Sequence, residues 1–376
     1  MDHSDVVIIG AGVIGLSVGF HLLHRSPGLR VTIVEQAEAA GTGSTAKATG
    51  GIRHQFAIPI LVALSQQSLA EYRTFEALTG VDVEFKDVGY LLFSTSDAEA
   101  DRLRAALAVQ RAFGVEAQDL TAVDIAHRWP YLRADDILLG VYTPGDGHAN
   151  PYAAVMGYLQ AFRRLGGRVI LGERVIGIDA SNRVTAVRTE RQVLPTSAVV
   201  NAAGVSAAEV AAMVGVTIPV RPFRRQIAAL TPLEFSAQRV PFTMHTDSGW
   251  YLHRQSDGVV LLGGIDKDTH PGTVETVDLA VISRLLEVGL TRLPDLARAA
   301  LMRSYAGLRA LTPDDLPILG PVPAIEGFFC ACGLAGHGFM HAPAVGDALA
   351  QWLLHGTVDL PGLDRCLPNR FAGTPV

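Results

Sequence analysis

A glycine-rich turn between a buried strand and a helix is the feature that most constrains this fold. Residues 5–9 (DVVII) are apolar without alternation, which is typical of a strand buried on both faces of a parallel sheet. The segment GAGVIG at residues 10–15 follows, and residues 16–24 then show helical spacing of apolar positions. A second buried strand is predicted at residues 31–35 (VTIVE). The order strand, helix, strand predicts a right-handed crossover in a parallel sheet.

The pattern G-x-G-x-x-G in this context predicts a dinucleotide site. Gly10 permits a tight turn, Gly12 lets the backbone approach a pyrophosphate, and Gly15 lets helix and strand pack closely. The helix N-terminus offers N–H groups and a positive dipole end to the phosphates. Glu35, about 20 residues after Gly15, is expected to accept hydrogen bonds from the adenosine ribose. The predicted contacts are Gly10, Gly12, Val13, Ile14, Gly15, Glu35 and Gln36.

Two further segments favour FAD over NAD as the dinucleotide. Residues 201–204 (NAAG), with Ala203 and Gly204, end a predicted strand, and residues 333–339 (GLAGHGF) form a second strand–turn–helix far downstream. The positive end of that second helix is expected to face the flavin pyrimidine edge and stabilise the negative charge of reduced flavin. No second glycine fingerprint for NAD(P)H is present. An NAD-dependent dehydrogenase, which would be colourless, is the disfavoured alternative.

Composition excludes several other classes. Half of the 376 residues are apolar and 18% are charged, which indicates a globular enzyme of two lobes. The net charge of −6, without a Lys/Arg block, argues against a nucleic-acid partner. Three cysteines (Cys330, Cys332 and Cys366), and no basic leader before Val6, favour a cytoplasmic location. No run of about 18 apolar residues predicts a membrane span, and no ligand spacing predicts a metal site.

The order of strands and helices along the rest of the chain predicts an α/β cofactor lobe within a protein that is α+β overall. We expect a Rossmann-like FAD-binding lobe with a parallel sheet and a substrate lobe with a mixed or antiparallel sheet. Both lobes are predicted to be discontinuous, with residues 1–84, 150–218 and 319–376 in the FAD-binding domain and residues 85–149 and 219–318 in the substrate-binding domain. Single helices are predicted at residues 60–78, 98–113, 151–165, 277–293 and 342–354.

Four segments, in matching order, resemble the D-amino acid oxidase-like (DAO) FAD oxidoreductases, in particular the sarcosine oxidase and glycine oxidase branch. They are residues 7–35, 43–56 (GSTAKATGGIRHQF), 305–320 (YAGLRALTPDDLPILG) and 333–346 (GLAGHGFMHAPAVG). The resemblance implies removal of a hydride from the carbon beside an amine. The resulting imine is hydrolysed by water. Oxygen commonly reoxidises the flavin with release of hydrogen peroxide, and some members use another electron acceptor.

The resemblance also implies further cofactor contacts. One loop is expected along the pyrophosphate and flavin, Val175 is expected at the adenine side through its backbone, and a second glycine turn is expected at the flavin edge. The loop residues are Ser44, Thr45, Thr49, Gly50 and Gly51, and those of the turn are Gly336, His337, Gly338, Phe339 and Met340.

Four residues are candidates for the substrate side. Arg53 and Arg309 match carboxylate-binding arginines of sarcosine oxidases and glycine oxidase, since a guanidinium binds a carboxylate through two parallel bonds. Either could instead pair with a carboxylate of the protein itself. Tyr251 matches a tyrosine that closes over the substrate, or is an ordinary buried sheet residue. His337 is better explained as a flavin-contacting or structural residue than as a base, and His54 is similarly ambiguous.

Three departures from the resembling enzymes matter. Gly307 stands where monomeric sarcosine oxidases attach flavin through a cysteine, so noncovalent FAD is expected. Met340 replaces a lysine of the carboxylate pocket. Val259 and Val260 stand where a lysine promotes reaction with oxygen, and Lys267 lies beyond that strand.

The function expected from the sequence is FAD-dependent oxidation of the C–N bond of a small amino or N-methylamino acid, with sarcosine and glycine first. Oxygen or another electron acceptor would complete the turnover. L-Proline or D-amino acid dehydrogenation are alternatives with the same chemistry. A flavin subunit of a larger electron-transfer complex is an alternative of another class, and oligomers are possible.

Overall fold

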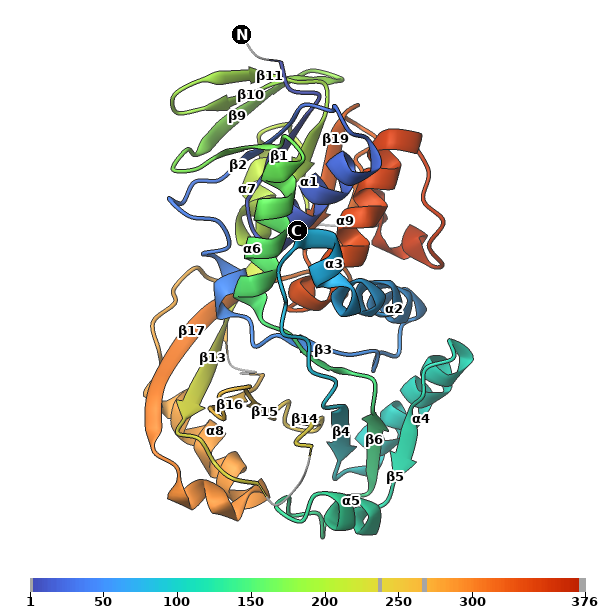
Figure 1. Cartoon of the computed structure of the whole chain (residues 1–376), viewed down its shortest axis with the longest axis vertical. Coiled ribbons are helices and arrows are strands. Elements are labelled where there is room, and N and C mark those ends of the chain that lie inside the picture. Colours follow the sequence, from blue (N-terminus) through green and yellow to red (C-terminus); the bar gives the residue numbers. More distant parts are fainter. Residues whose placement is uncertain (1–2, 236–238, 266–268, 372–376) are drawn as a thin grey trace.

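The computed structural model describes residues 3–235, 239–265 and 269–371. Two large sheets occupy opposite ends of the molecule, one with several helices packed around it and one at the lower end of the view (Figure 1). Two small sheets accompany them. The parallel and mixed sheets confirm the predicted fold class, whereas the predicted boundaries of the two lobes stay a prediction.

The six-stranded sheet has the order β18-β19-β12-β1-β2-β8. Its strands run parallel except β18, which is antiparallel to β19. Strands β1, β2 and β12 are buried along their whole length, as their apolar runs predict. The strands are β1 (Val6–Ile9), β2 (Val31–Val34), β8 (Arg168–Ile170), β12 (Val199–Asn201), β18 (Ile318–Pro321) and β19 (Phe328–Cys332).

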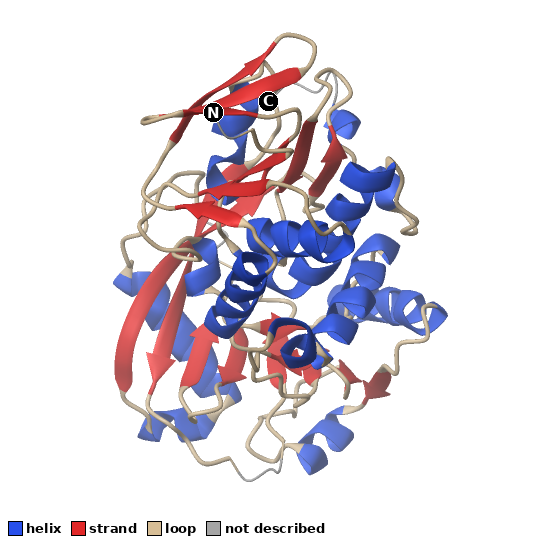
Figure 2. Cartoon of the chain, turned by 45° about the horizontal axis from the view of Figure 1, so that its top comes forward, coloured by secondary structure: helices blue, strands red, loops and turns tan. Residues whose placement is uncertain are grey.

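Helices cover one face of this sheet, where Val6 and Ile8 pack into the larger core. Its other face, with Val7 and Ile9, packs against α7 and a small three-stranded sheet that the sequence analysis missed. Both layers are visible in Figure 2. The elements are α1 (Val13–Arg25), α2 (Pro59–Arg73), α3 (Phe75–Thr79), α6 (Pro151–Arg164), α7 (Ala207–Ala212), α9 (Gly338–His355), β9 (Val175–Ala180), β10 (Val184–Thr189) and β11 (Val193–Pro195).

The single helix predicted at residues 60–78 is wrong. Helix α2 ends at Arg73 and α3 begins at Phe75. At Thr74 between them, φ is −111° and ψ is 12°, and the hydroxyl donates to the carbonyls of Ala70 and Glu71. A threonine hydroxyl that bonds to the preceding turn favours a helix end over continuation.

The eight-stranded sheet has the order β17-β13-β16-β15-β14-β4-β6-β5. It is antiparallel except where β14 runs parallel to β4. Helices α4 and α8 pack on it. The elements are β4 (Tyr90–Ser94), α4 (Asp97–Ala112), β5 (Gln118–Leu120), α5 (Ala122–Arg128), β6 (Leu139–Thr143), β13 (Arg221–Leu230), β14 (Phe242–His245), β15 (Tyr251–Arg254), β16 (Val260–Gly263), α8 (Leu279–Arg292) and β17 (Leu301–Leu311).

Short elements connect the two ends of the molecule. The two-stranded sheet of β3 (Gly51–Ile52) and β7 (Gly147–His148) lies between them, as does the 3-10 turn η1 (Ser44–Lys47). The other 3-10 turns are η2 (Gly204–Ser206), η3 (Pro294–Arg298), η4 (Leu363–Cys366) and η5 (Pro368–Phe371). Within the described ranges, no helix has both the length and the apolar character that crossing a membrane requires.

Candidate active site

One cavity of about 680 Å³ runs from the glycine turn before α1 to the turn before α9. Both large sheets contribute to its wall. The residues predicted to contact the cofactor line it, with the exception of Gly15. They are Gly10, Gly12, Val13, Ile14, Glu35, Gln36, Ser44, Thr45, Thr49, Gly50, Gly51, Val175, Ala203, Gly204, Gly336, His337, Gly338, Phe339 and Met340.

The first glycine turn has the backbone that a nucleotide site requires. Gly10 has a φ of +106°, which favours glycine. A Cβ on Gly15 would lie 2.0 Å from the Gly10 carbonyl oxygen, so Gly15 serves helix–strand packing rather than the cavity wall. A Cβ on Gly12 would meet only the Thr45 hydroxyl within 4 Å, which leaves the helix N-terminus accessible.

Glu35 directly follows β2 at the same edge of the sheet. Its carboxylate accepts hydrogen bonds from the backbone N–H groups of Ala11 at 2.8 Å and Ala37 at 2.9 Å. A carboxylate has about four acceptor sites, so two remain for ribose hydroxyls. The glycine turn, the open helix N-terminus and this carboxylate together fit the ADP half of FAD.

The loop after β2 joins the two sheets. The Ser44 hydroxyl donates to the Leu308 carbonyl of β17 at 2.7 Å, and the Thr45 hydroxyl accepts from the Val13 N–H at 3.3 Å. Residues 49–51 follow along the same wall. A cofactor in this cavity would therefore contact both ends of the molecule.

The second glycine turn lies against Arg309. A Cβ on Gly336 would lie 2.7 Å from the Arg309 Nε atom, so the guanidinium packs directly on the turn. Arg309 lies on β17 opposite Phe223 of β13, and the register places Tyr305 and Gly307 on the same face of the strand. All three β17 residues line the cavity.

Arg53 lines the same cavity from the loop after β3. Its guanidinium carbon lies 4.1 Å from the centroid of the Phe56 ring, and its Nη1 donates to the Gln55 carbonyl. Burial, opposed by the charges of Tyr90 and Asp146, lowers the pKa of Arg53. Among residues 3–235, 239–265 and 269–371, no carboxylate forms an ion pair with Arg53 or Arg309. Both guanidinium groups thus remain available to an anion in the cavity.

Tyr251 is 7% exposed and lines the cavity from β15. Burial raises the pKa of Tyr251, although the Arg309 charge and hydrogen bonds with Thr49 and Arg309 oppose the rise. The phenol therefore keeps its proton at neutral pH and can donate to a bound anion.

His337 stands at the N-cap position of α9, with its ring centroid 4.9 Å from that of Phe56. Burial lowers the pKa of His337 well below its ordinary value, and the nearby charges of Arg53, His341 and Arg309 lower it further. The imidazole is neutral at neutral pH. His54 is not among the cavity residues and bonds to the buried carboxylate of Asp146 at 2.5 Å.

Several cavity residues were not predicted. Among them are Lys47, Tyr90, Arg225, Phe242 and Asp315. Tyr90 and Phe242 stack with ring centroids 4.4 Å apart, and burial raises the pKa of Asp315. Arg225 lies opposite Gly307 in the β13–β17 register, which the sequence does not reveal. Lys47 lies within the GSTAKATGG segment, and this position could have been singled out there.

The structure gives a physical account of the departure at Gly307. A Cβ there would lie 2.9 Å from the Lys47 Cβ atom, so Lys47 occupies the place of a side chain at 307. Lys47 itself pairs with Glu275.

The positions of the other two departures are also defined. Met340 is buried in the cavity wall, and Val260 is buried on β16. Lys267 lies outside the described residues.

Residues 5–352 match the family described as FAD dependent oxidoreductase (DAO). The chain belongs to this family. Its cofactor is therefore FAD, which fits the glycine turns, Glu35 and the elongated cavity.

Several named enzymes are similar to this chain over most of its length. Dimethylglycine dehydrogenase of Mus musculus is 29% identical over 98% of this chain and 44% of its own length. Glycine oxidase of Geobacillus kaustophilus is 30% identical over 92% of both. L-Proline dehydrogenase from P. horikoshii has a similar structure, with a TM-score of 0.92, 27% identity and 98% of each chain covered. The chain thus spans less than half the length of the mammalian dimethylglycine dehydrogenases it matches.

Proposed function

We propose that this DAO family member oxidises the C–N bond of a small amino or N-methylamino acid, with noncovalently bound FAD as the hydride acceptor and dioxygen as the final oxidant. The observation that carries the proposal is a pair of cavity arginines without an acidic partner among the described residues. Both guanidinium groups are half-buried, and a partly desolvated cation without a carboxylate in ion-pair contact is costly unless a ligand supplies negative charge.

Arg309 is proposed to hold the substrate carboxylate. Its guanidinium packs against the turn that begins α9, so a carboxylate bound there would lie beside the cofactor edge. The protonated Tyr251 hydroxyl would donate a further hydrogen bond to the same carboxylate. Arg53, held over Phe56, adds a second positive charge near His337.

Aromatic side chains of the cavity wall would shield the reacting carbon from water. Tyr90, Phe242 and Phe339 line the cavity, and a dry pocket favours the uncharged amine over the ammonium form. When bound, FAD supplies the acceptor for the hydride that leaves the carbon beside nitrogen. Loss of that hydride and of one N–H proton gives an imine, and water hydrolyses the imine to a carbonyl compound and an amine or ammonia.

A dehydrogenase that passes electrons to another acceptor is the second candidate. Val259 and Val260 stand where the resembling oxidases carry a lysine that promotes reaction with oxygen. Several similar proteins are named dehydrogenases, including those for dimethylglycine and L-proline. An electron acceptor other than dioxygen would then reoxidise the cofactor. Reoxidation in air separates the two candidates.

The test is an anaerobic visible spectrum of the purified protein, titrated with sarcosine, glycine, L-proline and D-alanine and then opened to air. Bleaching of the flavin bands by sarcosine or glycine, with recovery in seconds and formation of peroxide, is the expected result. Bleaching by L-proline with slow recovery would instead establish the dehydrogenase. A yellow protein that none of the four compounds reduces would overturn the proposed substrate class.

A further inference from the structure

Helix α9 contains a proline in its second turn. Pro343 has no backbone N–H, so it cannot donate to the carbonyl four residues earlier, which belongs to Phe339. Phe339 lies in the first turn of α9, and residues 336–340 line the cavity. The helix therefore lacks one internal hydrogen bond at the end that faces the cofactor site.

Tyr72 of α2 supplies a donor to this carbonyl. Its hydroxyl donates to the Phe339 carbonyl oxygen at 2.6 Å, and the two rings lie 5.3 Å apart. Tyr72 is 1% exposed. Burial raises the pKa of Tyr72 well above its ordinary value, so the hydroxyl keeps its proton and remains a donor.

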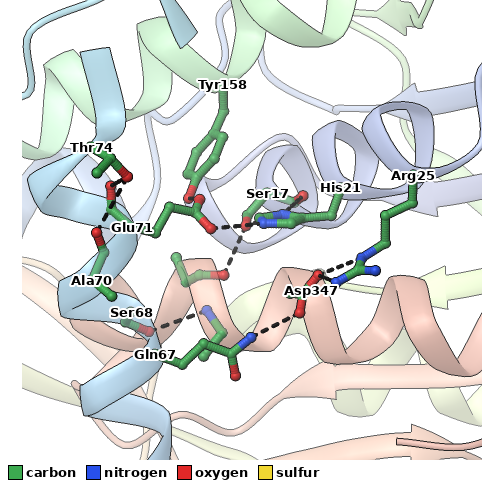
Figure 3. Close-up of polar contacts among 12 residues, drawn as sticks. Ser17, His21, Arg25, Gln67, Ser68, Ala70, Glu71, Thr74, Tyr158 and Asp347 are labelled. Atoms are coloured by element: carbon green, nitrogen blue, oxygen red, sulfur yellow. Dashed lines mark hydrogen bonds and ion pairs between the residues drawn. The ribbon is translucent and has the colours of Figure 1, made fainter. Parts of the chain in front are cut away.

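Serine side chains bond to the two residues that flank Pro343 (Figure 3). The Ser17 hydroxyl of α1 donates to the Ala342 carbonyl at 2.8 Å, and the Ser68 hydroxyl of α2 accepts from the Ala344 N–H at 3.1 Å. Neither Ala342 nor Ala344 lines the cavity. The bond from Tyr72 differs because Phe339 is itself part of the cavity wall.

We propose that Tyr72 is a positioning residue for the cofactor, because its hydroxyl replaces the donor that Pro343 lacks and keeps the first turn of α9 aimed at the FAD edge. The proposal rests on the placement of FAD proposed above. The positive end of a helix stabilises negative charge that develops on the reduced cofactor. Loosening this turn therefore makes reduction less favourable.

The test compares the midpoint potential of bound FAD in the wild-type and Tyr72→Phe holoenzymes. The substitution keeps the ring and removes only the hydroxyl. At a fixed potential, the ratio of reduced to oxidised cofactor is expected to fall about tenfold, which corresponds to a potential about 30 mV lower for a two-electron couple. The FAD dissociation constant, measured by fluorescence, is expected to rise in the same variant.

Tyr158→Phe is the matched control. Tyr158 is also fully buried in the helical layer, but its hydroxyl donates to Glu71 at 2.6 Å and not to α9 (Figure 3). Its variant should keep the wild-type potential. Adding Pro343→Ala to Tyr72→Phe restores a backbone N–H four residues after Phe339, so the potential should return toward the wild-type value.

An unchanged potential in Tyr72→Phe, an equal fall in Tyr158→Phe, or a fall that Pro343→Ala does not reverse would each overturn the inference. These outcomes are distinct from failure of the proposed function. If the wild-type protein binds FAD and is reduced by an amino acid, and the Tyr72→Phe variant has the same midpoint potential, only the role of Tyr72 is contradicted. A wild-type protein that no amino acid reduces contradicts the proposed function.

Discussion

Arg309 is the residue on which the proposed substrate binding depends most directly. It lies on the same face of β17 as Tyr305 and Gly307, and it contacts the turn that begins α9. The rigid strand β17 directs Arg309 into the cavity, where no carboxylate of the described residues forms an ion pair with this arginine. The charge is therefore held in place before a substrate arrives.

Replacing Arg309 with Met should raise KM for the amino acid about 30- to 1000-fold, because a buried charge pair with the substrate is worth about 2–4 kcal/mol. Steady-state kinetics and substrate titration of the flavin spectrum measure this. Arg303→Met is the control, since Arg303 is exposed on the same strand and lies outside the cavity. An unchanged KM would indicate that Arg53, and not Arg309, binds the substrate carboxylate.

Helices α1, α2, α6 and α9 are joined by a buried polar network (Figure 3). His21 of α1 bonds to Glu71 of α2 at 2.9 Å, Glu71 also accepts from Tyr158 of α6, and Arg25 pairs with Asp347 of α9. Burial opposes protonation of His21, but the hydrogen bond and charge of Glu71 outweigh it, so the pKa of His21 is raised. The network is therefore sensitive to pH.

A raised pKa in the folded state means that the His21–Glu71 pair stabilises the protein fully below about pH 6.5 and loses this contribution as pH rises through the folded value. His21→Gln should therefore lower the free energy of unfolding by about 1–3 kcal/mol at pH 6 and by less at pH 9. Melting curves at both pH values measure this difference. His24→Gln, at an exposed position on the same helix, is the control and should change the free energy of unfolding equally at pH 6 and pH 9. An equal loss of unfolding free energy at both pH values for His21→Gln would contradict the charge pair.

The contact between α1 and α9 depends on Gly346. A Cβ at this position would lie 2.1 Å from the Ser17 Oγ atom and 2.7 Å from its carbonyl carbon. Gly346→Ala is therefore expected to destabilise the protein by about 1–3 kcal/mol, through forced separation of the two helices. Chemical denaturation measures the loss. Gly272→Ala, where an added methyl group meets no atom within 4 Å, should be close to neutral.

Elements with strong local patterns could be predicted from the sequence. The strand, glycine turn and helix at the N-terminus follow from an apolar run, G-x-G-x-x-G and helical spacing within about 30 residues. The three-stranded sheet β9–β11 was missed because its strands are short and half-exposed. The break at Thr74 was missed because a helix end set by a hydroxyl hydrogen bond does not change the spacing of apolar residues. Arg225 was missed because only the β13–β17 register brings it to the cavity.

At the scale of the whole molecule, the cavity lies between two sheets that share few direct contacts with each other. The loop containing Ser44 and Thr45 bonds to both sides, and the cofactor is expected to do the same. Binding energy for FAD is therefore also folding energy, since an unfolded chain offers no cavity.

Removing FAD should accordingly lower the melting temperature, and adding it back should raise that temperature with increasing FAD concentration. At a hundredfold excess over the dissociation constant the stabilisation is about 2.7 kcal/mol. Differential scanning fluorimetry of apo and reconstituted protein measures the effect. A melting temperature that does not respond to FAD would contradict a cofactor bound between the two sheets.

The strand order also determines when the six-stranded sheet can be completed during synthesis on the ribosome. Strand β1 lies between β2 and β12, and β12 needs β19 as its other neighbour. About 320 residues separate β1 from β19, which at about 5–20 residues per second takes roughly 15–65 s to translate. Until then the nascent chain exposes unpaired edges of buried strands to solvent. Because residues of β19 and α9 line the cavity, we expect cofactor loading only after both elements have emerged.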